Sequence, residues 1–246
     1  MYASLLLLIA YLLGSFPSAL IIGKKAKGID IREYGSKNLG TTNAIRVLGK
    51  KLGLTVFILD VLKGAIAVGG ARILYEVCGY QFTEMADFFN FGQLTVFPPL
   101  YYGLMAVIGH MYPVFANFKG GKAVATSLGI TLVIAPVPAL LCLLVFWITL
   151  KISGYVSLSS TFAILTVCIS SFIQHFVPFF SNIFGHLSIE ILVFFSAISL
   201  FMIFKHRKNY IRILNGTENS FKKKKVEKLN DANITIENDV KDNQEA

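Results

Sequence analysis

The apolar run LGLTVFILDVLKGAIAVGGARIL, residues 52–74, is long enough to cross a bilayer as one helix, since a span needs roughly 20 mainly apolar residues. The chain of 246 residues is 54% hydrophobic and only 15% charged, with a mean hydropathy of +0.63, which lies outside the composition of ordinary soluble domains. Further apolar runs cover residues 2–22, 94–115, 123–150, 155–173 and 187–204. We therefore predict an all-α polytopic integral membrane protein.

The run at residues 123–150 determines the number of spans. Pro136 and Pro138 interrupt it, because a proline ring removes a helical hydrogen bond, and each half is then short for a full span. Two short helices give about seven spans, whereas a re-entrant hairpin gives five. The first run, residues 2–22, lacks the basic flank and small-residue cleavage site of a signal peptide, so we expect it to be retained as one span.

Positive charge is concentrated in a few polar segments. The formal net charge is +9, and eight basic residues lie between the first and second apolar runs, opposed there only by Asp30 and Glu33. Residues 75–98 contain no Lys or Arg. The positive-inside rule then predicts an N-terminus outside the cell, a cytoplasmic C-terminus and every basic segment on the cytoplasmic face. This topology explains the charge through membrane lipids and without a nucleic acid partner.

The chain divides into two parts by composition. Residues 1–218 carry the apolar runs and form the predicted membrane-embedded domain. Residues 219–246 are polar and rich in Asn, and we expect a disordered cytoplasmic tail because they bury too little apolar area to fold. The three cysteines are scattered without metal-ligand spacing, so no metal, cofactor or disulfide is predicted.

The first polar segment is YGSKNLGTTNAIRVLGKK, residues 34–51. Glycines let backbone amides approach an anion, hydroxyls and amides add hydrogen-bond donors, and an arginine can grip a phosphate with two parallel bonds. A polar cytoplasmic connector is the alternative interpretation. The candidate ligand-binding residues here are Ser36, Asn38, Gly40, Thr42, Asn43 and Arg46.

The second polar segment is GHMYPVFANFKGGKAVAT, residues 109–126. It is not a Walker A loop, because Ala116 stands where the first glycine belongs and Ala123 follows the last lysine. What remains is KGGK directly before a helix, and a helix N-terminus favours anions. A plain turn anchored by lysines is the alternative. The candidates here are Lys119, Gly120, Gly121 and Lys122.

The third polar segment is KHRKNYIRILNGTE, residues 205–218. Its spacing of three and six residues places His206, Asn209 and Arg212 near one face of a helix. A juxtamembrane basic helix lying on lipid headgroups is the alternative.

Two further polar features lie within apolar runs. Asp60 and Lys63 are three residues apart, so they can neutralise each other on one helix face, and ionisable groups at membrane depth mark a function or a tight helix contact. Ser157, in YVSLSS at the start of another run, adds a hydroxyl for the site or for helix packing. The three polar segments together indicate a site for more than one anionic group.

The three segments resemble the signature motifs of the bacterial acyl-phosphate-dependent glycerol-3-phosphate acyltransferases. The resemblance runs from DIREYGSKNLGTTNAIRVLGK (residues 30–50) through GHMYPVFANFKGGKAVAT to HRKNYIRILNGTE (residues 206–218). It implies transfer of an acyl group from acyl phosphate to the 1-hydroxyl of glycerol 3-phosphate, which gives lysophosphatidic acid and inorganic phosphate. The implied location is the cytoplasmic face of a bacterial plasma membrane.

The resemblance also implies roles for individual residues. It makes Ser36 and Arg46 essential in the first motif, makes KGGK the glycerol phosphate loop, and gives Glu218 a structural role. The catalytic candidates are then His206, Asn209, Ser36 and Arg46. From their chemistry and position, Gly40, Thr42, Lys63, Ser157 and Arg212 join the substrate-binding candidates. The sequence departs from the family pattern at Lys37, Thr41 and Tyr210, where glycine, alanine and an aliphatic residue are usual.

His206 is the candidate base, because a histidine has a reference pKa near 6.5, close to the operating pH. A phosphate oxygen of the substrate is the alternative proton acceptor. Two other classes of function remain open from the residues alone: a transporter or flippase for an anionic solute or lipid, and a non-catalytic lipid-binding scaffold. A transporter predicts an internal repeat and a midplane site, whereas the polar groups of this chain cluster on one face.

Overall fold

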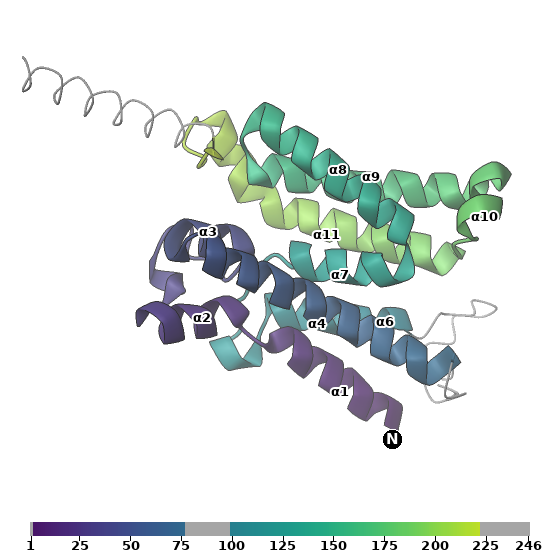
Figure 1. Cartoon of the computed structure of the whole chain (residues 1–246), viewed down its shortest axis with the longest axis horizontal. Coiled ribbons are helices and arrows are strands. Elements are labelled where there is room, and N and C mark those ends of the chain that lie inside the picture. Colours follow the sequence, from purple (N-terminus) through teal and green to yellow (C-terminus); the bar gives the residue numbers. More distant parts are fainter. Residues whose placement is uncertain (1, 77–98, 222–246) are drawn as a thin grey trace, which may run out of the picture.

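The computed structural model describes residues 2–76 and 99–221, and all regular elements in these ranges are helical (Figure 1). Residues 77–98 and 222–246, on which the expectations for the outer loop and most of the tail fall, lie outside the described residues. The elements are α1 (Tyr2–Ser15), α2 (Ser18–Lys27), η1 (Ile31–Glu33), α3 (Thr41–Leu48), α4 (Lys50–Glu76), α6 (Pro99–Met111), η2 (Val114–Ala116), α7 (Val124–Ile134), α8 (Pro136–Ser153), α9 (Val156–Phe176), α10 (Pro178–Phe184) and α11 (Ile189–Leu214).

The helices pack in two groups that α7 joins. Figure 1 shows α1, α4 and α6 on one side and α8, α9 and α11 on the other, and α7 packs on both α4 and α8. The contact between α4 and α7 depends on two glycines: a Cβ atom at Gly64 would lie 2.1 Å from the carbonyl oxygen of Thr126, and one at Gly129 would lie 2.0 Å from that of Val61. Close backbone approach through small residues is the usual way in which membrane helices associate.

The predicted spans are only partly confirmed. By length and composition α4, α8, α9 and α11 can each cross a membrane, and the bent pair α1 and α2 can count as a fifth span among the described residues. The run at residues 52–74 is helical throughout, within α4. The prediction that both halves of the run at 123–150 are short is right for α7, with 11 residues, and wrong for α8, with 18. Pro136 begins α8, because a proline in the first turn of a helix loses no hydrogen bond there.

The run at residues 2–22, predicted as one span, is a pair of helices with a bend between them. The helix ends at Ser15, restarts at Ser18 and bends by 41°. Pro17 accounts for the break, because it has no backbone N–H and disfavours helical backbone at the residue before it.

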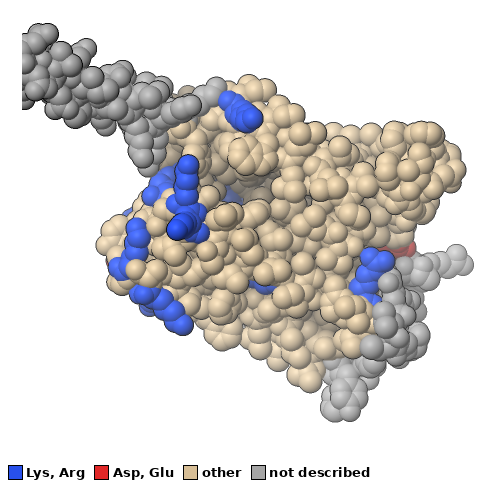
Figure 2. Space-filling model, in the orientation of Figure 1, with Lys and Arg blue, Asp and Glu red and all other residues tan. Residues whose placement is uncertain are grey.

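The polar segments meet at one end of the helices. In Figure 1, α2, α3 and the C-terminal end of α11 lie at the same end of the molecule, and Figure 2 shows Lys and Arg side chains gathered there. The predicted helix over His206, Asn209 and Arg212 is confirmed, because α11 continues through this basic stretch to Leu214. The fold therefore brings residues distant in sequence to one place.

Candidate active site

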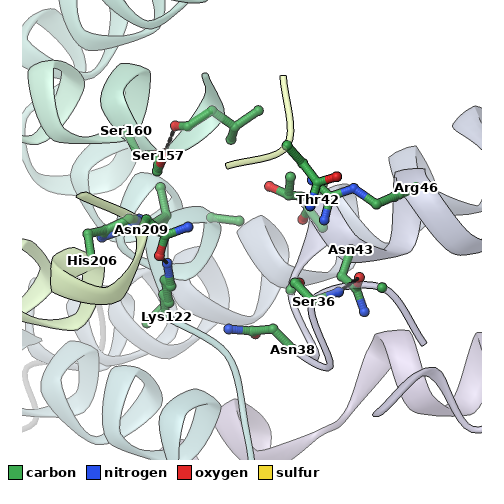
Figure 3. Close-up of a pocket in the computed structure, with 18 of the residues that line it drawn as sticks. Ser36, Asn38, Thr42, Asn43, Arg46, Lys122, Ser157, Ser160, His206 and Asn209 are labelled. Carbon is green, nitrogen blue, oxygen red and sulfur yellow. Dashed lines mark hydrogen bonds between the residues drawn. The ribbon is translucent and has the colours of Figure 1, made fainter. Parts of the chain in front are cut away.

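A pocket of about 420 Å³ opens at this end of the molecule, and all three polar segments line it (Figure 3). In Figure 3, residues of the first polar segment form one wall, and Lys122, Ser157, His206 and Asn209 face them from the other side. The helices that carry these two walls belong to the two groups joined by α7. The pocket therefore lies between the two groups of helices.

Most of the predicted site residues reach this pocket. Its lining includes Ser36, Asn38, Gly40, Thr42, Asn43, Arg46, Lys122, Ser157, His206, Asn209, Arg212 and Glu218. Four predicted residues lie outside the lining: Lys63, Lys119, Gly120 and Gly121. Lys119 is exposed at the surface. Lys63 is buried and donates to Asp60 at 2.9 Å, which confirms the predicted pairing of these two residues.

Asn43 holds the loop of the first polar segment in place. Its Oδ1 accepts a hydrogen bond from the backbone N–H of Ser36 at 2.8 Å, and its Nδ2 donates to the carbonyl oxygens of Ile31 and Tyr34 at 3.3 and 3.1 Å. A Cβ atom at Gly35 would lie 2.3 Å from Asn43 Oδ1, so only glycine fits there. The amide of Asn43 is thus occupied by the loop that presents Ser36 to the pocket.

Lys37, one of the departures from the family pattern, has a φ of 58°. This left-handed backbone conformation favours glycine. The loop therefore keeps the conformation that a glycine would adopt, with a lysine in its place.

Arg46 extends into the pocket from α3 and is half-buried. Burial lowers its pKa below the ordinary value, Glu218 opposes this shift and Arg212 adds to it. None of the described residues gives Arg46 an ion pair, although Glu218 lies near enough to act on it electrostatically. Its guanidinium is therefore available to an anionic ligand.

Lys122 is the cation at the opposite wall, and its Nζ donates a hydrogen bond to Oδ1 of Asn209. Burial lowers the pKa of its ammonium group to about 8, Glu218 opposes this shift and Arg212 adds to it. The first residues of α7, Val124 and Ala125, also line the pocket. The N–H groups of a first helical turn have no partner within the helix, so this helix start is suited to an anion.

His206 is buried in α11, with 3% of its surface exposed. Its Nδ1 lies 2.8 Å from the carbonyl oxygen of Met202. Because a carbonyl only accepts hydrogen bonds, this contact assigns the ring proton to Nδ1 and leaves Nε2 as the nitrogen that can accept a proton. The imidazole is thus held in the tautomer that a general base requires.

Glu218 organises the third polar segment. Its Oε1 accepts a hydrogen bond from Asn209 Nδ2 at 2.8 Å, and its Oε2 accepts one from Arg212 Nε at 2.6 Å. The hydroxyl of Ser157 lies 3.5 Å from Oε1. These contacts orient Asn209 and Arg212, as a structural role for the carboxylate requires.

Some pocket residues were not predicted from the sequence. An apolar wall contains Phe57, Val124, Phe146 and Val156, and two buried ionisable residues, Asp60 and His110, also reach the lining. A phenylalanine within an apolar run looks the same whether it faces lipid or a pocket, so no sequence signal distinguished Phe57 or Phe146. His110 belongs to the second polar segment, and its place in that segment was the available signal.

The site therefore combines cations on facing walls, a helix N-terminus, a buried imidazole and an apolar surface. Such a site suits chemistry on phosphate-bearing molecules that also carry a lipid chain. Over the described residues, fold and site together define a helical protein with apolar helices long enough to span a membrane and, at one end of them, a pocket whose chemistry suits phosphate.

Comparison with known proteins identifies the family. The glycerol-3-phosphate acyltransferase family matches residues 4–216. The chain is 42% identical over 218 residues to the glycerol-3-phosphate acyltransferase of Bacillus subtilis, covering 89% of this chain and 97% of that one. It is also 42% identical over 215 residues to the enzyme of Enterococcus faecalis, covering 87% and 89% of the two chains.

Solved structures agree with this result. The fold is similar to that of PlsY, an integral membrane glycerol 3-phosphate acyltransferase, in its glycerol 3-phosphate form, with a TM-score of 0.72 and 36% identity over 90% of this chain and 96% of that one. The lysophosphatidic acid form gives a TM-score of 0.70. The chain belongs to the glycerol-3-phosphate acyltransferase family and is an acyltransferase.

Proposed function

We propose that the chain transfers an acyl group from an acyl phosphate to the 1-hydroxyl of glycerol 3-phosphate, in the pocket between the three polar segments. The observation that carries this proposal is the meeting of Arg46, Lys122 and His206 beside an apolar wall. The products are lysophosphatidic acid and inorganic phosphate, in agreement with the glycerol 3-phosphate and lysophosphatidic acid forms of PlsY.

The two substrates are anions that repel each other, and the pocket supplies positive charge against both. Arg46 stands on one wall, and Lys122 with the start of α7 stands on the other. Because these groups are partly buried, their attraction for phosphate is stronger than in water. The apolar wall around Phe57 and Phe146 is suited to the acyl chain of the donor, which enters from the bilayer.

In the chemical step, the hydroxyl oxygen of glycerol 3-phosphate forms a bond to the acyl carbonyl carbon, and the bond between that carbon and the phosphate oxygen breaks. The hydroxyl proton passes to Nε2 of His206 and from there to an oxygen of the departing phosphate, which leaves as inorganic phosphate and returns His206 to its starting state. Asn209, Ser36 and Ser157 line the same pocket and are the candidate donors to the carbonyl oxygen as it gains negative charge. If a phosphate oxygen takes the proton instead, His206 orients the hydroxyl.

The topology belongs to the same proposal. Seven crossings by α1, α4, α6, α7, α8, α9 and α11 place the pocket and the gathered Lys and Arg side chains on one side, which is the cytoplasmic side by the positive-inside rule. The N-terminus is then outside and the C-terminus inside a bacterial plasma membrane, with residues 1–218 as the catalytic domain. Labelling of single cysteines placed at Lys119 and at Gly185 tests this: a reagent that cannot cross the membrane should label only the second in intact cells.

Measurement of phosphate release tests the function. Purified protein in detergent is given palmitoyl phosphate with and without glycerol 3-phosphate, and the lipid products are identified by mass spectrometry. Phosphate release that depends on glycerol 3-phosphate, with an equal yield of lysophosphatidic acid, is the expected result. Folded protein that forms neither product contradicts the proposal and calls for transport assays in liposomes. No observation on the described residues favours a transporter.

A further inference from the structure

Asp60, Lys63 and His110 form a buried polar cluster beside the pocket. Their exposed fractions are 1%, 5% and 6%. Asp60 and His110 reach the pocket lining, whereas Lys63 does not. The chemical step described above uses none of them, yet ionisable groups at this depth are costly and usually mark a function.

The contacts of this cluster converge on one carboxylate oxygen. Oδ1 of Asp60 accepts hydrogen bonds from Lys63 Nζ at 2.9 Å and from Ser18 Oγ at 2.6 Å. Lys63 Nζ also donates to the carbonyl oxygen of Phe16 at 3.3 Å, at the break between α1 and α2. His110 Nδ1 lies 3.7 Å from the same Oδ1, which is beyond hydrogen-bond distance, so these two buried groups face each other without a hydrogen bond. The cluster thus joins α4, α6 and the start of α2.

Both glycines of the KGGK loop pack on His110. The backbone N–H of Gly121 donates to the carbonyl oxygen of His110 at 3.0 Å. A Cβ atom at Gly121 would lie 2.0 Å from His110 Nε2, and one at Gly120 would lie 2.1 Å from the His110 carbonyl oxygen. Only glycine fits at either position, so the place of His110 determines the path of the loop that leads into Lys122.

We propose that Asp60 and Lys63 are positioning residues for glycerol 3-phosphate, which act through His110 on the KGGK loop. The ion pair lies against the His110 ring and limits where it can sit, His110 supports Gly120 and Gly121, and the loop sets Lys122 and the start of α7 against the substrate phosphate. This inference rests on the proposed function. It explains how two glycines that lie outside the pocket lining affect the position of Lys122 within it.

The inference predicts a selective effect on one substrate. The double variant Asp60→Asn with Lys63→Met removes both charges at nearly constant side-chain size. We expect its KM for glycerol 3-phosphate to rise about tenfold, as small displacements of binding groups do, while its KM for acyl phosphate changes less than about twofold. Ser18→Ala, which removes one hydrogen bond and little volume, should raise the KM for glycerol 3-phosphate about threefold.

Two variants of His110 distinguish a role in supporting the KGGK loop from a general role in folding. His110→Ala removes the surface on which the glycines pack, and we expect the KM for glycerol 3-phosphate to rise about 100-fold. His110→Phe restores a ring of similar size and should recover most of this loss. His175→Gln is the matched control, because His175 lies at the end of α9 remote from the pocket. It should leave both KM values unchanged.

Thermal unfolding with and without glycerol 3-phosphate provides a readout independent of turnover. The shift in Tm that the substrate induces should shrink in the double variant and in His110→Ala, and should persist in His175→Gln. A wild-type protein that forms no lysophosphatidic acid contradicts the proposed function, whatever the variants do. An active wild type with unchanged KM values in the folded variants contradicts the positioning role.

A fall in kcat together with similar rises in both KM values would also contradict the positioning role, because this pattern indicates general damage to the fold. If the double variant does not fold, Ser18→Ala and His110→Phe decide the question, since they change the least volume. Their KM values for glycerol 3-phosphate must lie between those of the wild type and His110→Ala.

Discussion

Two lysines of this protein, one buried and one half-buried, have opposite surroundings. Lys63, inside α4, donates to the carboxylate of Asp60 at 2.9 Å, so its charge is neutralised where it lies. Lys122, in the pocket, donates to the neutral amide of Asn209, and its positive charge stays uncompensated by any direct ion pair with a described residue. A lysine paired with a carboxylate contributes to the structure, whereas a lysine bound only to a neutral amide can still bind an anion, as the proposed function requires of Lys122.

Two histidines repeat this contrast. His206 and His175 both place Nδ1 against a backbone carbonyl oxygen, at 2.8 Å from Met202 and 2.5 Å from Leu187. Only His206 lines the pocket. His175 lies 18 residues beyond Ser157 along α9, or roughly 27 Å at 1.5 Å per residue. Location, rather than local bonding, therefore distinguishes the catalytic candidate.

The first prediction compares the two histidines by mutation. His206→Ala should lower kcat by about 10²- to 10⁴-fold, because it removes the group that accepts or orients the hydroxyl proton. His175→Ala should leave kcat within about twofold of the wild type. Steady-state kinetics with saturating acyl phosphate measures both. A loss confined to KM in His206→Ala would assign His206 to substrate binding.

The second prediction concerns Lys63, the paired lysine, and the free energy of unfolding. Lys63→Met should lower the free energy of unfolding by about 3–5 kcal/mol, because it leaves the carboxylate of Asp60 buried without a counter-charge. Adding Asp60→Asn should recover most of this loss. Lys151→Met, at an exposed position of α8, should change the free energy of unfolding by less than about 1 kcal/mol. Titration with a denaturing detergent measures the series, and equal values for Lys63→Met and Lys151→Met would overturn the contrast.

The third prediction concerns Lys122, the lysine that donates to an amide. Lys122→Met should raise the KM for glycerol 3-phosphate by about 10- to 100-fold, the cost of one lost hydrogen bond to a charged group. Its free energy of unfolding should stay within about 1 kcal/mol of the wild type, since burial of the ammonium group already costs energy. Initial rates at varied glycerol 3-phosphate measure this.

Lys119→Met is the control, because Lys119 is exposed and lies outside the pocket lining. Its KM should change by less than about threefold. A large effect there would show that both lysines of KGGK bind the phosphate, as the sequence alone predicted.

Much of this contrast could be predicted from the sequence, because it depends on short spacings within one helix. The interval between Asp60 and Lys63 placed them on one face, and the ion pair is present. The intervals among His206, Asn209 and Arg212 placed them on one face, and all three line the pocket. The helix over residues 52–74 followed from length and apolar composition alone.

The rest required contacts between distant segments. Gly120 and Gly121 indicated close approach of the backbone to something, but not that this partner is His110. Phe57 and Phe146 lie in helices whose apolar residues are spread around the axis, so no periodicity showed which face meets the pocket. Pro17 lies within an apolar run, and hydropathy averaged over the run hides the break in the helix. At this break Lys63 donates a hydrogen bond to the carbonyl oxygen of Phe16.

The charge of Lys122 can be tested through the pH dependence of the KM for glycerol 3-phosphate. Burial lowers the pKa of this ammonium group to about 8, so it is charged below that pH and becomes neutral above it. The substrate phosphate, with a second pKa near 6, remains a dianion over the same range. The KM for glycerol 3-phosphate should therefore be flat from pH 7 to about 8 and rise about tenfold by pH 9. Lys122→Arg, whose guanidinium stays charged, should flatten this rise, and a rise that persists in Lys122→Arg would assign the titration to another group.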